Sequence, residues 1–169
     1  VNKEHSRSRL RLCFASPTHE EIRKGIATLA GVEGVQIVHG SPHDEDEYLI
    51  LLPEAMRSLD ETEPPLTFFG HTHIQGGFFV GADDAAAIRP VYNSHGTSEK
   101  FVFKLEKNVR YLINPGSVGQ PRDGDWRAAF AVFDDAHEQG EEGRRLGGHG
   151  GSSPSLALTV AACSSGSPR

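Results

Sequence analysis

Three short runs of mainly apolar residues in this chain each lead directly into small and polar residues. VQIV at 35–38 precedes HGSP, LTFF at 66–69 precedes GHTH, and RYLI at 110–113 precedes NPGS. Short apolar runs bounded by turn residues are typical of buried strands. Because ligands in sheet-based folds gather beyond the carboxyl ends of strands, the pattern predicts a sheet with polar groups collected at one edge.

The chain up to about residue 135 contains more strand signals than helix signals. Thr18 and Glu21 have capping-box spacing before apolar residues at helical period, which predicts a helix over 19–30. We also expect a short helix at 53–59, strands at 76–80, 101–105 and 128–133, and a loop over 81–99. This layout predicts an α/β or α+β sandwich.

The two ends of the chain differ in composition from its middle. Residues 1–17 show no clean period, and residues 136–169 are rich in Gly, Ser and charge. Composition of the second kind cannot build a core. We therefore expect an irregular segment over 1–17, a folded domain over 18–135 and a disordered tail over 136–169. The tail is either a flexible extension or the product of a shifted reading frame.

Charge and cysteine content argue against several function classes. The net charge is −6, and the densest basic group is Arg7, Arg9 and Arg11, so we expect no broad nucleic-acid surface. The cysteines, Cys13 and Cys163, form no CxxC pair, which excludes a zinc ribbon or a redox motif. The apolar stretch SLALTVAAC near the C-terminus is too short to cross a membrane. We expect a soluble, cytoplasmic protein.

Histidines follow two of the three strands and are candidate metal ligands. Gly70 permits a turn after its strand, so that the rings of His71 and His73 can swing toward one region. His39 repeats the order of apolar strand, histidine and glycine. Neutral imidazole binds zinc, iron and similar ions. The alternative is that the GHTH pair are surface-loop histidines, in a chain with 9 histidines, and that His39 is structural.

A glycine-rich turn after the third strand supplies candidate phosphate ligands. Exposed backbone N–H groups and a serine hydroxyl can receive phosphate oxygens, which indicates Asn114, Gly116 and Ser117. Arg122 follows closely and could clamp an anion or pair with the neighbouring aspartates. The alternative for 114–117 is an ordinary Pro-Gly turn.

With these motifs in this order, the chain resembles the calcineurin-like metallophosphoesterase superfamily, most closely its small bacterial phosphodiesterase-like members. The resemblance is carried by IVHGSP at 37–42, FFGHTHIQGGF at 68–78 and YLINPGSVGQPRDGD at 111–125. It implies a β-sandwich flanked by helices and hydrolysis of phosphate mono- or diesters. It also implies two divalent ions, commonly manganese, iron, zinc or nickel, and a small phosphorylated substrate.

The resemblance implies a role for each histidine. His39 and His71 would bind the second metal and His73 the first, and a metal-bridging hydroxide would attack the phosphorus. The superfamily places three further motifs earlier in the chain: an Asp-x-His, a Gly-Asp that bridges the metals, and a Gly-Asn-His that carries the general-acid histidine. Residues 1–38 contain none of them. We therefore expect the N-terminal half of the sandwich to be missing and no catalytic residue to be present.

This departure limits what the chain could do alone. A bridging carboxylate offsets the repulsion between two dications, whereas three neutral imidazoles would hold at most one ion, which we expect to be zinc. Half a sandwich exposes strand edges, so we expect marginal stability and association through an exposed sheet edge. Three interpretations stay open: the C-terminal part of a phosphoesterase that is inactive in isolation, a non-catalytic module that binds one metal or phosphate, and a non-functional gene fragment.

Overall fold

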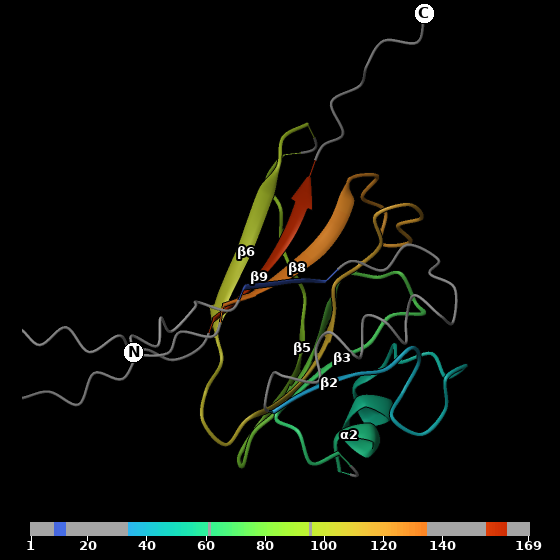
Figure 1. Cartoon of the computed structure of the whole chain (residues 1–169), viewed down its shortest axis with the longest axis vertical. Coiled ribbons are helices and arrows are strands. Elements are labelled where there is room, and N and C mark those ends of the chain that lie inside the picture. Colours follow the sequence, from blue (N-terminus) through green and yellow to red (C-terminus); the bar gives the residue numbers. More distant parts are fainter. Residues whose placement is uncertain (1–8, 13–33, 61, 95, 135–154, 162–169) are drawn as a thin grey trace, which may run out of the picture.

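The computed structural model describes residues 9–12, 34–60, 62–94, 96–134 and 155–161, which form two sheets and one helix (Figure 1). One sheet has five strands in the order β2-β3-β7-β4-β5, and the other has four in the order β1-β8-β9-β6. The elements are β1 (Arg9–Leu12), β2 (Val35–Ile37), α2 (Leu52–Asp60), β3 (Leu66–Phe68), β4 (Gly76–Val80), β5 (Ala85–Ile88), β6 (Glu99–Lys104), β7 (Arg110–Asn114), β8 (Ala128–Asp134) and β9 (Ser155–Ala161).

The register of the five-stranded sheet brings three strand ends level with one another. β2, β3 and β7 run parallel, with Ile37 opposite Phe68 and Phe68 opposite Ile113. β4 then pairs antiparallel with β7, and β5 antiparallel with β4. The three motifs that the sequence singled out therefore leave the sheet at the same edge.

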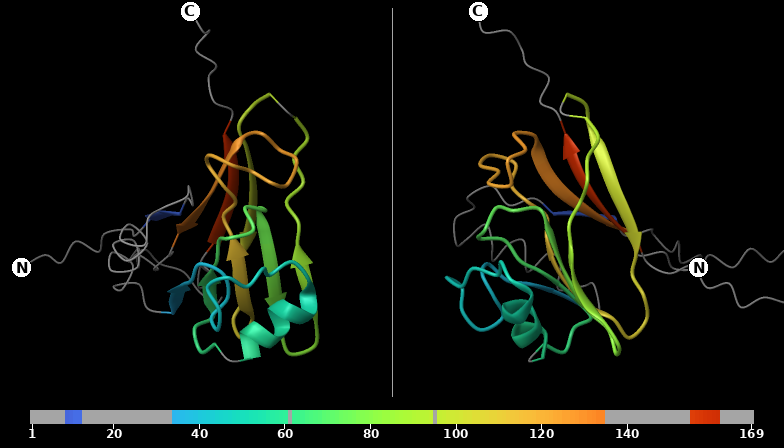
Figure 2. Two further views of the ribbon diagram at one scale, coloured as in Figure 1. Left: turned by 90° about the vertical axis from the view of Figure 1, so that its right-hand side faces the viewer. Right: turned by 180° about the vertical axis from the view of Figure 1, so that it is seen from behind.

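The five-stranded sheet is buried on both faces. Along β7, Ile113 belongs to the cluster between the two sheets and Leu112 to the cluster beneath α2, and each is 0% exposed. Figure 2 shows α2 lying against the outer face of this sheet, away from the four-stranded sheet. Strands covered on both faces consist of continuous apolar runs, which explains LTFF and RYLI. The mixed α/β sandwich expected from the sequence is confirmed in the described residues.

Polar side chains bond to the backbone at both ends of helix α2. The Glu54 carboxylate accepts the N–H groups of Ile50 and Leu51 at 2.9 and 3.0 Å, which satisfies donors that a helix start leaves open. At the other end, the Thr62 hydroxyl donates to the Leu59 carbonyl at 3.2 Å. The helix predicted at 53–59 is present, one residue longer at each end.

The prediction of a disordered tail over 136–169 is wrong for residues 155–161. These residues form β9, which lies between β6 and β8 in the four-stranded sheet. Leu156 and Leu158 are 0% exposed and Val160 is 1% exposed. Their period of two matches a strand with one buried face, a signal that the composition of the flanking residues masked. The rest of 136–169 lies outside the described residues.

Two further expectations need correction. Within 1–17, residues 9–12 are not irregular but form β1, which pairs antiparallel with β8. Within the loop predicted over 81–99, the residues AAAI form β5 against β4. Alanine has little intrinsic preference for strands, so the pairing with β4 decides the conformation. The helix predicted over 19–30, and both cysteines, lie outside the described residues.

No helix in the described part of the chain is long and apolar enough to cross a membrane. β2 and β5 stand at the two ends of the five-stranded sheet. Association through an exposed sheet edge stays a prediction, as do the compartment and the domain limits.

Candidate functional site

His39 and His71 meet beyond the carboxyl ends of β2 and β3. The Gly70 N–H donates to the His39 carbonyl at 2.8 Å, which ties the two chain segments together. The His71 Nδ1 and His39 Nε2 atoms are 3.0 Å apart. The structure thus brings together two of the three histidines that the sequence nominates as ligands, at the predicted edge of the sheet.

His73 lies in the same turn and is oriented by a backbone carbonyl. Its Nδ1 is 2.9 Å from the Gln120 carbonyl oxygen. A carbonyl oxygen only accepts, so Nδ1 carries the proton and the neutral ring presents Nε2 as its lone-pair nitrogen. Metal-bound histidines almost always donate their second N–H to such a partner. The Nε2 of His73 is therefore available to a metal ion.

The environment of His39 favours its neutral form. Burial is the largest cause of its lowered pKa, and the nearby His71 is the next, while Glu45 and Asp46 partly oppose the effect. Its Nδ1 is buried and has no hydrogen-bond partner in the described part of the structure. A neutral imidazole keeps a lone pair for a cation.

The turn at residues 70–73, the histidine turn, has its left-handed backbone at the two histidines and not at Gly70. The backbone φ angle is 56° at His71 and 58° at His73, both in the left-handed region, and Gly70 is absent from the residues with positive φ. A residue with a β-carbon loses about 1–2 kcal/mol in that region. Surrounding contacts must therefore hold the turn.

Asn114 supplies several of those contacts and so differs from its predicted role. It is 1% exposed, and its Nδ2 donates to the Gly70 carbonyl and to the Thr72 hydroxyl, both at 2.8 Å. The Gly116 N–H in turn donates to the Asn114 Oδ1 at 2.9 Å. The groups that the sequence assigned to phosphate already have partners inside the protein.

The other two phosphate candidates, Ser117 and Arg122, differ in their exposure to solvent. Ser117 is 1% exposed, and its Oγ accepts the Gln120 N–H at 3.0 Å. Arg122 has an exposed side chain, and its backbone N–H donates to the His73 carbonyl at 3.1 Å. Of the four candidates, Arg122 is the one that lies beside the histidine turn and is open to solvent.

Tyr48 is a neighbour of the site that the sequence did not indicate. Its ring centroid is 4.1 Å from that of His71, and the residue is 45% exposed. The residues on either side are anchored: Glu47 pairs with Arg57 at 2.8 Å, and Leu49 is 3% exposed. Tyr48 follows the acidic run 44–47, which predicts only a solvated loop, so no local signal could have placed it here.

The His39–His71 pair fits two ligands of one ion. Zinc–nitrogen bonds of about 2.0–2.1 Å at angles between octahedral and tetrahedral separate two nitrogens by about 2.9–3.4 Å, and the observed separation is 3.0 Å. Without a cation, one of these two nitrogens must carry a proton and donate it to the other. In the described residues, however, no three His, Cys, Asp or Glu side chains form a group that could hold a metal. The fit is therefore for one ion with open positions.

In the described residues, no carboxylate completes a metal-binding group with the histidines. A Gly-Asp pair occurs at 124–125, and its Asp125 is bonded to the guanidinium of Arg127, with Nε and Oδ1 2.9 Å apart. The triplet Asp135-Ala136-His137 has the Asp-x-His form, but it follows the histidine motifs in the chain instead of preceding them. It lies outside the described residues.

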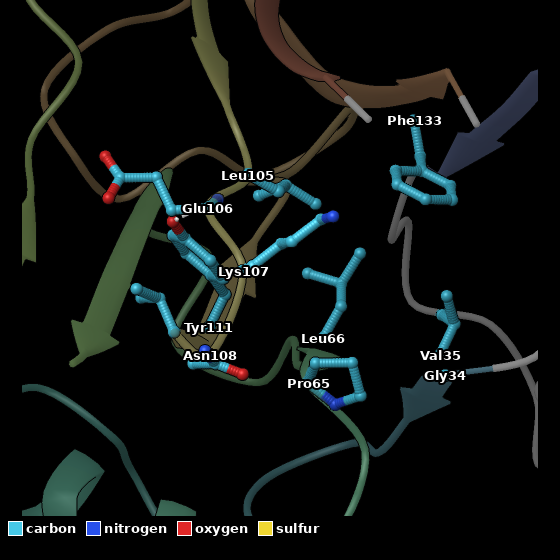
Figure 3. Close-up of a pocket in the computed structure, with 11 residues that line it drawn as sticks. Gly34, Val35, Pro65, Leu66, Leu105, Glu106, Lys107, Asn108, Tyr111 and Phe133 are labelled. Atoms are coloured by element: carbon cyan, nitrogen blue, oxygen red, sulfur yellow. Dashed lines mark hydrogen bonds between the residues drawn. The ribbon is translucent and has the colours of Figure 1, made fainter. Parts of the chain in front are cut away.

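A separate apolar cavity of about 500 Å³ opens at the other end of the strands (Figure 3). Val35, Leu66 and Tyr111 line it from the amino-terminal halves of β2, β3 and β7, and Phe133 lines it from β8. None of the candidate site residues borders this cavity. Its chemistry is therefore unrelated to that of the histidines.

Comparison with known proteins finds a sequence relative and solved structures with a similar fold. No protein-family model matches the chain. An uncharacterized protein of Methanocaldococcus jannaschii is 30% identical over 106 residues, which are 62% of this chain and 38% of that protein. A metallophosphoesterase from Sphaerobacter thermophilus is similar in structure, with a TM-score of 0.53, 28% identity and coverage of 82% of this chain and 50% of that one. The chain thus spans half or less of the length of these two proteins.

Proposed function

We propose that this chain provides the histidine part of a metal-dependent phosphoesterase site that acts on phosphate mono- or diesters. The observation that carries the proposal is the 3.0 Å approach of His71 Nδ1 to His39 Nε2 beyond two parallel strands. The structural similarity to a metallophosphoesterase supports it. A divalent cation such as manganese, iron, zinc or nickel would supply positive charge that polarises a phosphoryl oxygen and acidifies water.

Each residue of the site has a distinct part in this proposal. His39 and His71 would hold one ion through the ring nitrogens that lie 3.0 Å apart. His73 would offer its Nε2 to a second ion in a complete site, because Gln120 binds its Nδ1 proton. Arg122, which is exposed and tied to the same turn, contacts the substrate anion.

We also propose that the chain in isolation binds at most one ion, zinc by preference, and does not hydrolyse phosphoesters. Imidazoles are neutral ligands and cannot offset the repulsion between two dications as a bridging carboxylate does. In the described residues no carboxylate joins the histidines in a group of three, and Asp125 is held by Arg127. A single ion with several open positions lacks the second charge that stabilises a leaving oxygen.

Hydrolysis of bis(4-nitrophenyl) phosphate with manganese tests the catalytic part of the proposal. The 169-residue chain should be inactive, and a form extended at its N-terminus should be active. His71→Ala in the extended form should then abolish the activity. An extended form that has no activity with any of the four metals would remove the phosphoesterase assignment.

A non-catalytic metal-binding module is the second candidate, because two ring nitrogens meet at this edge and no third ligand joins them in the described residues. Calorimetric zinc titration of the wild type against His71→Ala and His73→Ala tests it, with His43→Ala as the matched control from an exposed position. Weaker binding in His71→Ala supports metal binding at the His39–His71 pair, and weaker binding in His73→Ala as well would indicate that all three rings share the ion. Identical isotherms in all four proteins would leave the interpretation of a non-functional fragment.

A further inference from the structure

We propose that Asn114 is a positioning residue that holds the His71–His73 turn in its ligating conformation, and that the turn at 114–117 serves this purpose and not phosphate binding. The inference deepens the proposed function and rests on it for the metal. The positioning role of Asn114 rests on hydrogen bonds between residues of this chain.

The two donors of the Asn114 amide enclose His71. One Nδ2 hydrogen reaches the carbonyl of Gly70, the residue before His71, and the other reaches the hydroxyl of Thr72, the residue after it, each at 2.8 Å. Both partners are fixed on either side of a single left-handed residue. Rotation of the His71 backbone toward an ordinary strand conformation would break at least one of these bonds.

The link continues to His73 through Thr72. The Thr72 hydroxyl accepts the Ile74 N–H at 3.3 Å as well as the Asn114 donor, and Thr72 is 3% exposed. Its oxygen therefore joins a bond before His73 to a bond after it. One buried amide thus constrains both left-handed histidines.

Gly116 fixes which way the Asn114 amide faces. The Gly116 N–H donates to Oδ1 at 2.9 Å, so the NH₂ group must point to the histidine turn. Gly116 has a φ of 84°, and a β-carbon there would lie 2.5 Å from the Ala129 side chain. The glycine is required by conformation and close packing, which explains the Asn-Pro-Gly sequence without a bound phosphate.

The donors of Asn114 are the feature that an experiment can remove. Asn114→Asp keeps the shape and replaces the two N–H donors by a carboxylate oxygen facing the Gly70 carbonyl. Thr72→Val removes the acceptor with little change of shape, and Thr72→Ser retains it. Tyr111→Phe is the matched control, since it lies on the same strand and loses one hydrogen bond, from the Glu106 N–H at 3.0 Å.

Two readouts on the full chain decide the proposal. In metal-free protein, amide hydrogen exchange over residues 70–75 should accelerate in Asn114→Asp and Thr72→Val, and stay at the wild-type rate in Thr72→Ser and Tyr111→Phe. Zinc affinity by calorimetry should fall about 10–100-fold in the first two variants, the range typical of partners that orient metal-bound histidines. The two conservative variants should bind zinc within about twofold of the wild type.

The outcomes separate this inference from the proposed function. Wild-type protein that binds no zinc would refute the metal assignment, while the exchange rates would still test the positioning role. Exchange and affinity unchanged in both Asn114→Asp and Thr72→Val would overturn the inference. Equal losses in Tyr111→Phe would also overturn it, because they would show a general loss of stability.

Discussion

Replacing Leu158 by alanine should destabilise the protein as a core substitution does. Leu158 is 0% exposed in the middle of β9, where it lies opposite Phe101 of β6 and Ala131 of β8. Removal of a fully buried leucine side chain costs about 2–5 kcal/mol. The cluster that contains Leu158 includes buried residues of β3 and β7 in one sheet and of β8 and β9 in the other. Side chains held by two sheets cannot collapse easily into the space, so we expect a loss of about 3–4 kcal/mol.

Urea unfolding followed by far-ultraviolet circular dichroism measures this loss. With a slope of about 1–3 kcal/mol/M, the midpoint should fall by about 1–4 M. Val102→Ala is the matched control: it removes methyl groups from the adjacent strand β6 at a position that is 61% exposed, and should change stability by no more than about 0.5 kcal/mol. Equal midpoints for the two variants would refute the placement of β9 in the core.

Three further predictions concern pH, charge and backbone conformation. Folding lowers the pKa of His39, so the unfolded metal-free chain binds a proton there more readily than the folded chain does. The free energy of unfolding should therefore fall as the pH drops below about 6.5. His39→Gln should reduce this pH dependence in urea unfolding curves, and an unchanged pH dependence would contradict the prediction. Arg127→Met leaves Asp125 and Glu99 without the guanidinium that binds both. The variant should lower the thermal midpoint by about 6–12 °C in calorimetry. A drop smaller than that of an Arg→Met variant at an exposed position would contradict this prediction. Gly116→Ala should destabilise by at least about 1 kcal/mol, because φ is 84° there, whereas a neutral result in urea would show that the turn relaxes.

Local patterns were sufficient for the strands that are buried on both faces. LTFF and RYLI are continuous apolar runs because β3 and β7 lie between α2 and the second sheet. β5 could not be predicted, since the three alanines of AAAI have little strand preference and the segment pairs with β4. β9 carried the correct period of two, but its surroundings of Gly and Ser outweighed it.

Part of the candidate site could be predicted from the sequence, and the rest depends on tertiary structure. The approach of His39 to His71 follows from parallel strands with level ends, which the order of the motifs already indicated. The role of Asn114 does not follow, because an Asn-Pro-Gly turn has the same sequence whether its amide meets a ligand or another loop. The contact of Tyr48 with His71 also depends on tertiary structure, since helix α2 anchors the loop through Arg57 and Glu47.

Nitrogen-15 NMR of the histidine side chains during zinc titration can show whether His39 and His71 share one metal ion. We expect Nε2 of His39 and Nδ1 of His71 to shift together and to saturate at one ion, because these are the atoms that lie 3.0 Å apart. The ring of exposed His43 should not shift. Saturation without a shift at either of the facing nitrogens would show that the two rings do not share an ion.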